Sequence, residues 1–131
     1  MYMLDTNMCI YIIKGKKEQV LKELQNKKKD GLSISTITLS ELEYGNENSQ
    51  YKEKNKIALM QFLTIIDIKV FDEKASEEFG IIKKYLKDRN CLIGPYDMLI
   101  GAHAKSLDLT LVTNNVREFE RIKGLKIENW V

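Results

Sequence analysis

Four acidic side chains, most of them just beyond strand-like segments, are the residues in this sequence best suited to chemistry. Asp5 directly follows the first apolar run, and Glu41 and Glu118 each lie about one helical turn beyond a later run. Asp97 lies two residues after Pro95, the only proline. Carboxylates that converge repel one another and cannot all ionise without a cation. Mg²⁺ or Mn²⁺ would relieve this repulsion, because both prefer oxygen ligands and keep water molecules for a substrate phosphate.

Each of these acids also has a purely structural explanation. Asp5 fits as the cap of the following helix, and Thr38-x-x-Glu41 fits a capping box. Asp97, near a helix N-terminus, would interact favourably with the helix dipole, and Glu118 fits a solvated surface acid. Asp5 has the least ordinary position, since it interrupts an apolar stretch where burial is expected.

Other catalytic arrangements have weaker support. His103, the only histidine, lies six residues after Asp97 and therefore off the helix face of Asp97, so a packed histidine is favoured over a general acid or base. The two cysteines, Cys9 and Cys91, form no CxxC motif and fit small buried apolar residues in a reduced, cytoplasmic protein. Neither GxGxxG nor GxxxxGK[ST] occurs, which argues against a phosphate-binding loop.

The elements that must position the acids alternate along the chain. Apolar and β-branched runs predict strands at residues 2–4, 32–37, 68–71, 109–113 and 126–130. Helical spacing and capping residues predict helices at residues 8–13, 16–28, from 38 onward, 54–66, 72–89 and 95–106. This alternation predicts an α/β fold with a parallel sheet covered on both faces, in which ligands bind at the carboxyl ends of the strands.

Length and composition limit the class of protein. The 131 residues suit one domain, residues 1–131, with no linker. A content of 44% hydrophobic and 31% charged residues excludes a disordered chain. No apolar run approaches the ~18 residues that would cross a membrane, and the N-terminus lacks the basic region and cleavage site of a signal peptide.

The charge distribution favours a polyanionic partner to a modest degree. Without the four candidate acids, the remaining residues carry a net charge of +6, four more than the +2 of the whole chain. Basic residues that could flank the acidic edge are Lys14, Lys16, Lys17, Lys27, Lys28, Lys29, Arg117 and Arg121. An ordinary lysine-rich surface explains these residues equally well.

Four ordered motifs together resemble the PIN-domain ribonuclease toxins of the VapC type. They are MLDTN at residues 3–7, SELEYG at 40–45, PYDMLIGAHA at 95–104 and LVTNNVREFERIKGLKIENW at 111–130. The resemblance is collinear and covers essentially the whole chain. It implies a three-layer α/β/α domain with a central parallel sheet, whose acidic residues bind Mg²⁺ or Mn²⁺ at the carboxyl ends of the strands.

The resemblance also implies a function. VapC-type proteins are endoribonucleases of bacterial toxin–antitoxin pairs; they cut RNA, in several members a tRNA, and a cognate VapB antitoxin silences them. They usually form homodimers, so the resemblance predicts a dimer here as well. An apolar face for self-association could come from Tyr44, Tyr51, Phe62 and Leu63, although core packing explains most of these residues equally well.

The family's acidic positions match Asp5, Glu41 and Asp97, of which Asp5 and Asp97 match the usual direct metal ligands. Asn115 stands where many relatives carry an aspartate, and Glu118 matches a further acid. In the implied mechanism, Glu41 and Glu118 complete the metal shell or orient the attacking water. Polar positions that line the same pocket match Thr6, Asn7 and Thr113.

Two other functions remain open at this point. One is a metal-dependent phosphohydrolase of small phosphate esters. A haloacid-dehalogenase-like site would need an aspartate two residues after Asp5, where Asn7 stands. The other is a non-catalytic PIN scaffold that binds a partner protein, and the presence of Asp5, Glu41 and Asp97 argues against it.

Overall fold

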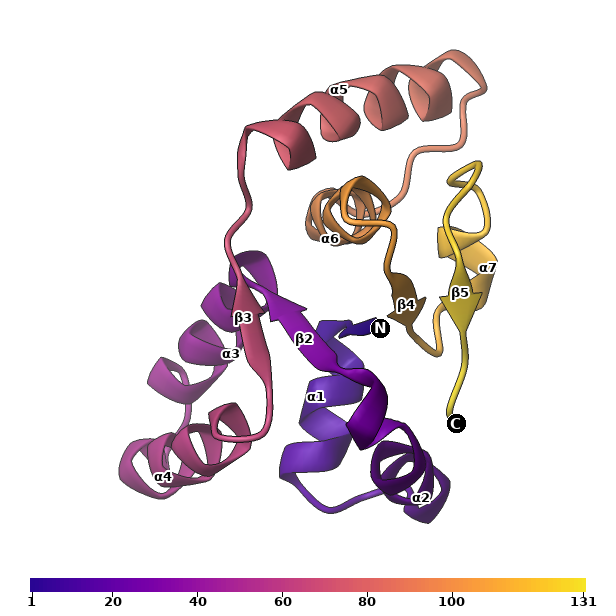
Figure 1. Cartoon of the computed structure of the whole chain (residues 1–131). Coiled ribbons are helices and arrows are strands. Elements are labelled where there is room, and N and C mark those ends of the chain that lie inside the picture. The colour runs from indigo at the N-terminus through magenta and orange to yellow at the C-terminus, as the bar shows by residue number, and fades with distance from the viewer.

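Five short parallel strands form one sheet in the order β3-β2-β1-β4-β5 (Figure 1). The computed structural model describes residues 1–131. The strands are β1 (Tyr2–Leu4), β2 (Leu32–Ser35), β3 (Asp67–Lys69), β4 (Thr110–Val112) and β5 (Ile127–Glu128). In the register, Met3 pairs with Ser33 of β2 on one side and with Leu111 of β4 on the other. The direction of strand order therefore reverses at β1, which places a topological switch point between β1 and β4.

Seven helices connect or follow the strands. They are α1 (Thr6–Ile13), α2 (Glu18–Lys27), α3 (Thr36–Glu47), α4 (Lys52–Leu63), α5 (Glu73–Asp88), α6 (Pro95–Ser106) and α7 (Val116–Phe119). A short 3₁₀ turn at Lys28–Asp30 leads into β2. None of the helices combines the length and apolarity needed to cross a bilayer.

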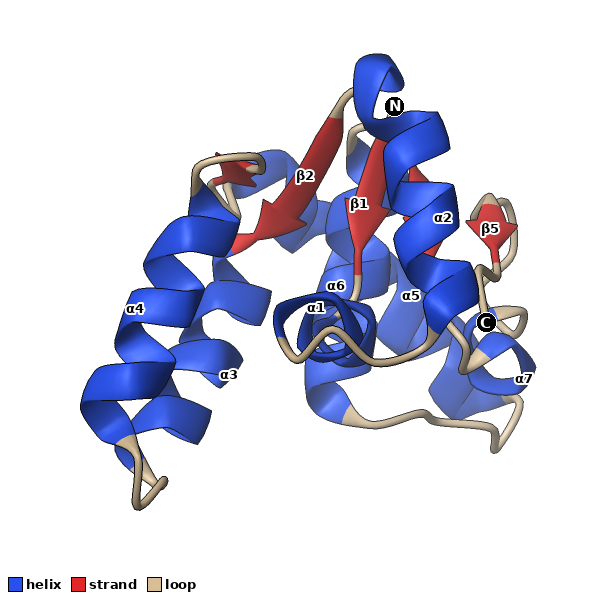
Figure 2. Ribbon diagram, turned by 90° about the horizontal axis from the view of Figure 1, so that it is seen from below, coloured by secondary structure: helices blue, strands red, loops and turns tan.

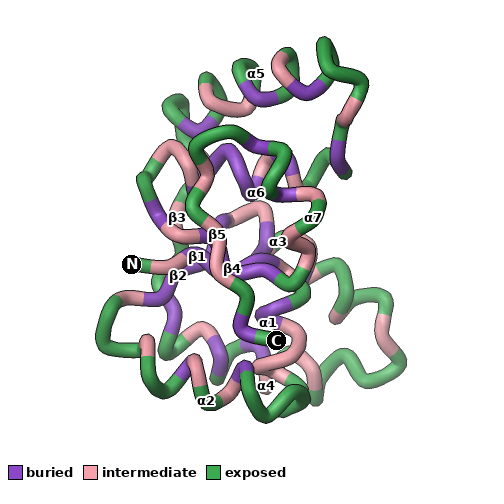
Figure 3. Tube along the Cα trace, turned by 90° about the vertical axis from the view of Figure 1, so that its right-hand side faces the viewer, coloured by how far each residue is buried: buried purple, intermediate pink, exposed green.

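The helices cover both faces of the sheet, which confirms the expected α/β/α layers (Figure 3). Successive residues of a strand point to opposite faces. Leu4 packs with buried residues of α1 to α4, whereas its neighbour Met3 packs with α5, α6 and α7. The same alternation separates Val112 from Leu111 on β4. The central strands β1, β2 and β4 are thus covered on both sides, as expected for a parallel sheet.

Helix α6 lies between the sheet and α5, and small residues make this position possible (Figure 1). Six of its residues are buried, including Gly101 and His103. A Cβ atom on Gly101 would lie 2.6 Å from Cδ1 of Ile122, so a larger residue would collide with the neighbouring layer. The close fit fixes the helix that carries Asp97 at its N-terminal end.

The predicted strand at residues 32–37 is too long, and the predicted capping box at Thr38 is wrong. β2 ends at Ser35, whose hydroxyl accepts a hydrogen bond from the backbone N–H of Ile37 at 3.0 Å and caps α3. Thr38 lies inside α3 and Glu41 one turn further. The β-branched residues at 36–38 suggested a strand, but the serine cap starts the helix earlier. The carboxylate of Glu41 is therefore not needed for capping.

Candidate active site

The switch point between β1 and β4 brings Asp5 and Thr113 together. The backbone N–H of Asp5 donates to the carbonyl of Val112 at 3.0 Å, so the two strand ends lie side by side. Figure 2 shows the arrowheads of the parallel strands β1 and β2 both pointing downward, with α1 below the arrowhead of β1. Asp5 caps α1 by accepting the N–H of Met8 at 2.9 Å, and its carboxyl group also receives a hydrogen bond from Thr113. The predicted cap role of Asp5 is confirmed.

The burial of Asp5 goes beyond what capping requires. Only 4% of the residue is exposed. Burial raises the pKa of its carboxyl group above the ordinary value, the hydrogen bonds from Thr113 and Met8 oppose this, and the charge of Glu41 adds to it. A buried carboxylate whose hydrogen bonds do not offset its desolvation is unfavourable for folding alone, and such groups concentrate at functional sites.

Asp97 lies in the first turn of α6 and faces the same centre. Its pKa is raised to about 6, chiefly by partial burial and then by the charges of Asp5, Glu118 and Glu41. The helix N-terminus at Pro95 would by itself favour an ionised carboxylate. Burial and the charges of the three other acids act in the opposite direction and favour the protonated form. All four predicted acids contribute to one electrostatic field.

Asn115 joins the carboxylates of α6 and α7. Its side-chain Nδ2 donates to Oε2 of Glu118 at 3.1 Å and to Oδ2 of Asp97 at 3.5 Å. Its backbone N–H donates to Oγ1 of Thr113 at 2.9 Å. The amide lowers the pKa of Asp97, in the direction opposite to the acids. Asn115 thus offsets repulsion at a position where an aspartate would add to it.

Glu41 is held from the other side by α1. The hydroxyl of Thr6 donates to Oε1 of Glu41 at 2.6 Å, and the hydroxyl of Thr38 lies 3.5 Å from that of Thr6. The sequence alone did not indicate Thr38 as a site residue, because its position suggested a cap. Asn7 is exposed and takes no part in these hydrogen bonds.

A buried contact that sequence patterns did not reveal links α3 to α6. Nδ1 of His103 lies 2.8 Å from Oγ of Ser35, the residue that caps α3. Burial lowers the pKa of His103, so the imidazole is kept neutral and packs edge-on against Phe71. A packed histidine is confirmed. The contact ties the helix of Asp97 to the helix of Glu41.

A groove of about 240 Å³ opens beside Glu41 between α1, α3 and α4. Its apolar walls are formed by Ile10, Ile13, Leu42 and Leu59, and its polar residues include Lys14, Asn46, Ser49 and Asn55. Nδ2 of Asn46 is buried and has no hydrogen-bond partner. Such a donor is unfavourable unless a bound molecule supplies an acceptor.

The donors at the acidic centre suit a hard divalent cation. No group of three acidic, histidine or cysteine side chains is gathered at metal-ligand spacing. The side chains that raise the pKa of Asp97 all offer carboxylate oxygens, and no thiol or imidazole takes part. Mg²⁺ prefers oxygen donors and is commonly bound by one or two protein carboxylates, with water in its other positions. Asp5 and Asp97 fit this pattern.

Comparisons with known proteins agree with the geometry. A model of the PIN domain matches residues 2–125. Ribonuclease VapC2 of Haemophilus influenzae is 44% identical over 130 residues, covering 99% of this chain and 98% of the relative. The tRNA(fMet)-specific endonuclease VapC of Shigella flexneri is 43% identical over 129 residues, covering 98% of this chain and 97% of the relative.

A solved structure is also similar over nearly the whole chain. VapBC2 from Rickettsia felis, crystallised with a DNA fragment from its promoter, matches with a TM-score of 0.95 and 38% identity. The match covers 99% of this chain and 98% of that one. The whole chain, including every acidic residue of the centre, therefore lies within the shared fold.

Proposed function

The chain belongs to the PIN-domain family of VapC ribonucleases, and from this premise we propose that it is the toxin of a type II toxin–antitoxin pair. Its activity in this proposal is hydrolysis of RNA phosphodiester bonds in the cytoplasm, dependent on Mg²⁺ or Mn²⁺. The observation that carries the proposal is the shared field of Asp5, Glu41, Asp97 and Glu118 at the sheet's switch point.

Asp5 and Asp97 would hold the cation, which when bound lowers the pKa of a water molecule and neutralises charge on the reacting phosphate. Both carboxyl groups have pKa values above the ordinary value, which means that their surroundings disfavour the ionised forms. The positive charge of a bound cation would favour the ionised forms instead. Asp5 is already oriented by the N–H of Met8 and by Thr113. The chain thus provides two ordered oxygen donors from different elements.

Glu41 and Glu118 would orient the attacking water and accept its proton. Each carboxylate is held by a neutral donor, Glu41 by Thr6 and Glu118 by Asn115. These hydrogen bonds fix the direction of the carboxylates before substrate binds, which limits reorganisation during the reaction. No side-chain nucleophile is required. Burial raises the pKa of Cys9 well above its ordinary value, which argues against this thiol as one.

The substrate class and the partner follow from the relatives. One relative is named a tRNA(fMet)-specific endonuclease, so we propose a tRNA as the RNA that is cut. Similar solved structures are VapBC complexes, so we propose a VapB-type antitoxin as the partner. The groove beside Glu41 suits a peptide, because its apolar walls accept aliphatic side chains and Asn46 offers a donor to a backbone carbonyl.

The test is metal-dependent RNA cleavage by the Asp5→Asn variant. Asparagine still accepts the N–H of Met8 and keeps the cap of α1, but it removes a charged donor for the cation. We expect cleavage to fall on the order of a hundredfold or more. In the absence of metal, the variant should be at least as stable as the parent at neutral pH, because it removes a buried charge whose pKa burial raises. Mapping of RNA 5′ ends after brief expression would identify the cut sites.

Asp67→Asn is the matched control, since Asp67 is exposed at the amino end of β3, whereas the acidic centre lies at the carboxyl ends of the strands. It should cleave RNA like the parent chain. Wild-type cleavage by Asp5→Asn, or cleavage that persists fully in EDTA, would overturn the proposal. Metal-dependent hydrolysis of p-nitrophenyl phosphate without RNA fragments would instead indicate a phosphohydrolase, and no metal-dependent activity at all would indicate a binding scaffold.

A further inference from the structure

We propose that Tyr11, Lys17 and Asn114 form a binding site for a backbone phosphate of the RNA, next to the acidic centre. The inference rests on the proposed ribonuclease function and names how the substrate is positioned. Nδ2 of Asn114 donates to the hydroxyl of Tyr11 at 3.2 Å, and Nζ of Lys17 lies 5.7 Å from the centre of the Tyr11 ring. We refer to these three residues as the Tyr11 cluster.

The Tyr11 cluster is continuous with the catalytic residues along the chain. Asn114 lies between Thr113, which bonds the carboxyl group of Asp5, and Asn115, which bonds Asp97 and Glu118. Tyr11 belongs to α1, the helix that Asp5 caps. The hydrogen bond from Asn114 to Tyr11 therefore connects the loop after β4 to α1 at the edge of the acidic centre.

The backbone after α1 places Lys17 over this helix in an unfavourable conformation. The chain turns back at Gly15, with φ of 64°, and the N–H of Lys16 donates to the carbonyl of Tyr11 at 2.9 Å. Lys17 itself has φ of 61° and ψ of 83°, in the left-handed region that favours glycine. A lysine here maintains a cation at this place despite the strain, and strained residues concentrate at functional sites.

The polar groups of the Tyr11 cluster are free to bind an anion. None of the ion pairs in the structure involves Lys17, which is exposed. The Tyr11 hydroxyl accepts from Asn114, which leaves its own proton available to a further acceptor. An ammonium group and a hydroxyl proton together match the non-bridging oxygens of a phosphodiester.

The charge layout favours RNA over an acidic protein segment. The acidic centre repels anions, so an RNA that spans it needs cations beside it to hold the phosphates that flank the cut. The Tyr11 cluster supplies such a cation on the side of the β4–α7 loop. The catalytic acids would repel an acidic peptide, and nothing in the binding of such a peptide requires it to lie next to them.

The test measures RNA binding without cleavage. In the Asp5→Asn background, Lys17→Gln should weaken binding of a fluorescein-labelled single-stranded RNA severalfold and by the same factor for different sequences, because a phosphate contact is independent of base identity. The slope of log Kd against log salt should fall by about 0.7, the value for one phosphate on a single strand. Tyr11→Phe should give a smaller loss, since it removes only the hydroxyl.

Lys123→Gln is the matched control, because Lys123 is exposed and lies in the loop before β5, near the amino ends of the strands. It should leave both affinity and salt slope close to those of the parent. If Lys17→Gln behaves like Lys123→Gln, the phosphate site is refuted and the ribonuclease proposal stands. If the Asp5→Asn parent binds no RNA, both the phosphate site and the ribonuclease proposal are refuted. If Lys17→Gln weakens only the binding of a labelled hexaglutamate peptide, the Tyr11 cluster binds protein and the inference is overturned.

Discussion

Ionisation of the Asp97 carboxyl group is unfavourable in the folded protein when no cation is bound. Partial burial and three neighbouring acids raise its pKa to about 6, whereas an unfolded chain would leave it near 3.8. Between these pH values the folded state therefore binds more protons than the unfolded state. The stability that protonated Asp97 contributes is fully present below pH 3.8 and is lost as pH rises through 6. At neutral pH the ionised Asp97 opposes folding until a cation compensates for it.

Asp97→Asn should therefore stabilise the metal-free protein while abolishing cleavage. After allowance for partial exposure, the gain in unfolding free energy at pH 7.5 is expected to be about 1–2 kcal/mol, and it should shrink toward zero near pH 4. Thermal unfolding in EDTA at both pH values measures this. Mg²⁺ should raise the melting temperature of the parent more than that of the variant. A variant that is less stable than the parent at pH 7.5 would contradict the electrostatic argument.

At the scale of elements, the start of α3 determines where Glu41 lies. The hydroxyl of Ser35 caps the helix through the N–H of Ile37 and also contacts His103 of α6. Thr6 of α1 then holds Glu41 one turn further along. Three helices thus fix one carboxylate, and a shift of α3 would move Glu41 relative to Asp5 and Asp97.

Ser35→Ala is expected to lower the unfolding free energy by about 1–2 kcal/mol, because it removes a helix cap and leaves His103 without its partner. It should also lower kcat for RNA cleavage more than it changes KM, since Glu41 is displaced and the RNA contacts remain. Ser40→Ala is the control on the same helix, where the exposed hydroxyl bonds only the carbonyl of Thr36. A similar loss of kcat in Ser40→Ala would refute a specific role for the cap.

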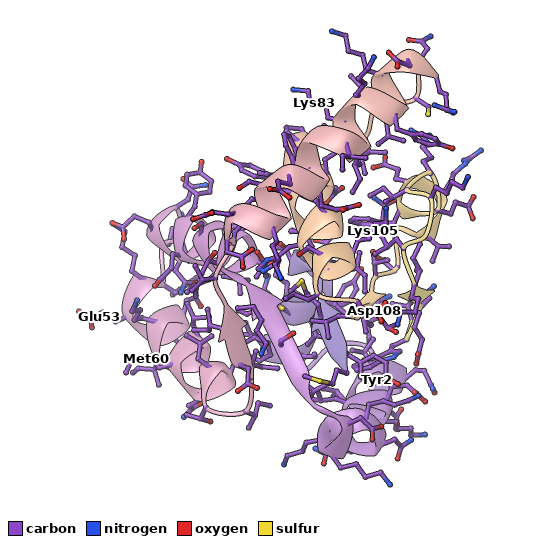
Figure 4. All side chains as sticks on the ribbon, turned by 45° about the horizontal axis from the view of Figure 1, so that its top comes forward. Tyr2, Glu53, Met60, Lys83, Lys105 and Asp108 are labelled. Atoms are coloured by element: carbon purple, nitrogen blue, oxygen red, sulfur yellow. The ribbon has the colours of Figure 1, made fainter.

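At the scale of the whole molecule, exposed apolar side chains concentrate on α4, on the edge strand β3 and beside it. They are Ile57, Met60, Ile65, Ile68 and Val70. Figure 4 shows Met60 projecting away from α4. Of the residues that the sequence suggested for self-association, Tyr44 and Tyr51 are exposed, but Phe62 is buried in the core. An edge strand beside exposed apolar groups is a surface that association would protect.

The expected homodimer should therefore use this surface. We predict a dimer by light scattering at micromolar concentration and a monomer for the double variant Met60→Lys and Val70→Lys, because two charges would be buried without partners. Ile81→Lys is the control, since Ile81 on α5 is 63% exposed, comparable to Met60 at 59%. A monomeric parent, or a double variant that remains dimeric, would contradict the prediction.

Local patterns were sufficient for most elements. Pro95 as the first residue of α6 and Asp72 as the cap of α5 are both confirmed, because such signals act within one helical turn. The start of α3 was predicted wrongly, since β-branched residues suit both strand and helix and only the cap decided between them. Ser35 and His103, which are 68 positions apart, gave no local signal of their contact.

The sequence by itself determined the alternation of strands and helices and the order of acidic residues at the strand ends, because these depend on short-range preferences and on residue type. The resemblance of its motifs then indicated the family. Only the tertiary structure decided that Asp97 shares one electrostatic field with Asp5, Glu41 and Glu118, that Asn115 bridges two of these acids, and that Tyr11 meets Asn114. Such contacts depend on how the sheet orders its strands, and no local preference encodes a distance between distant segments.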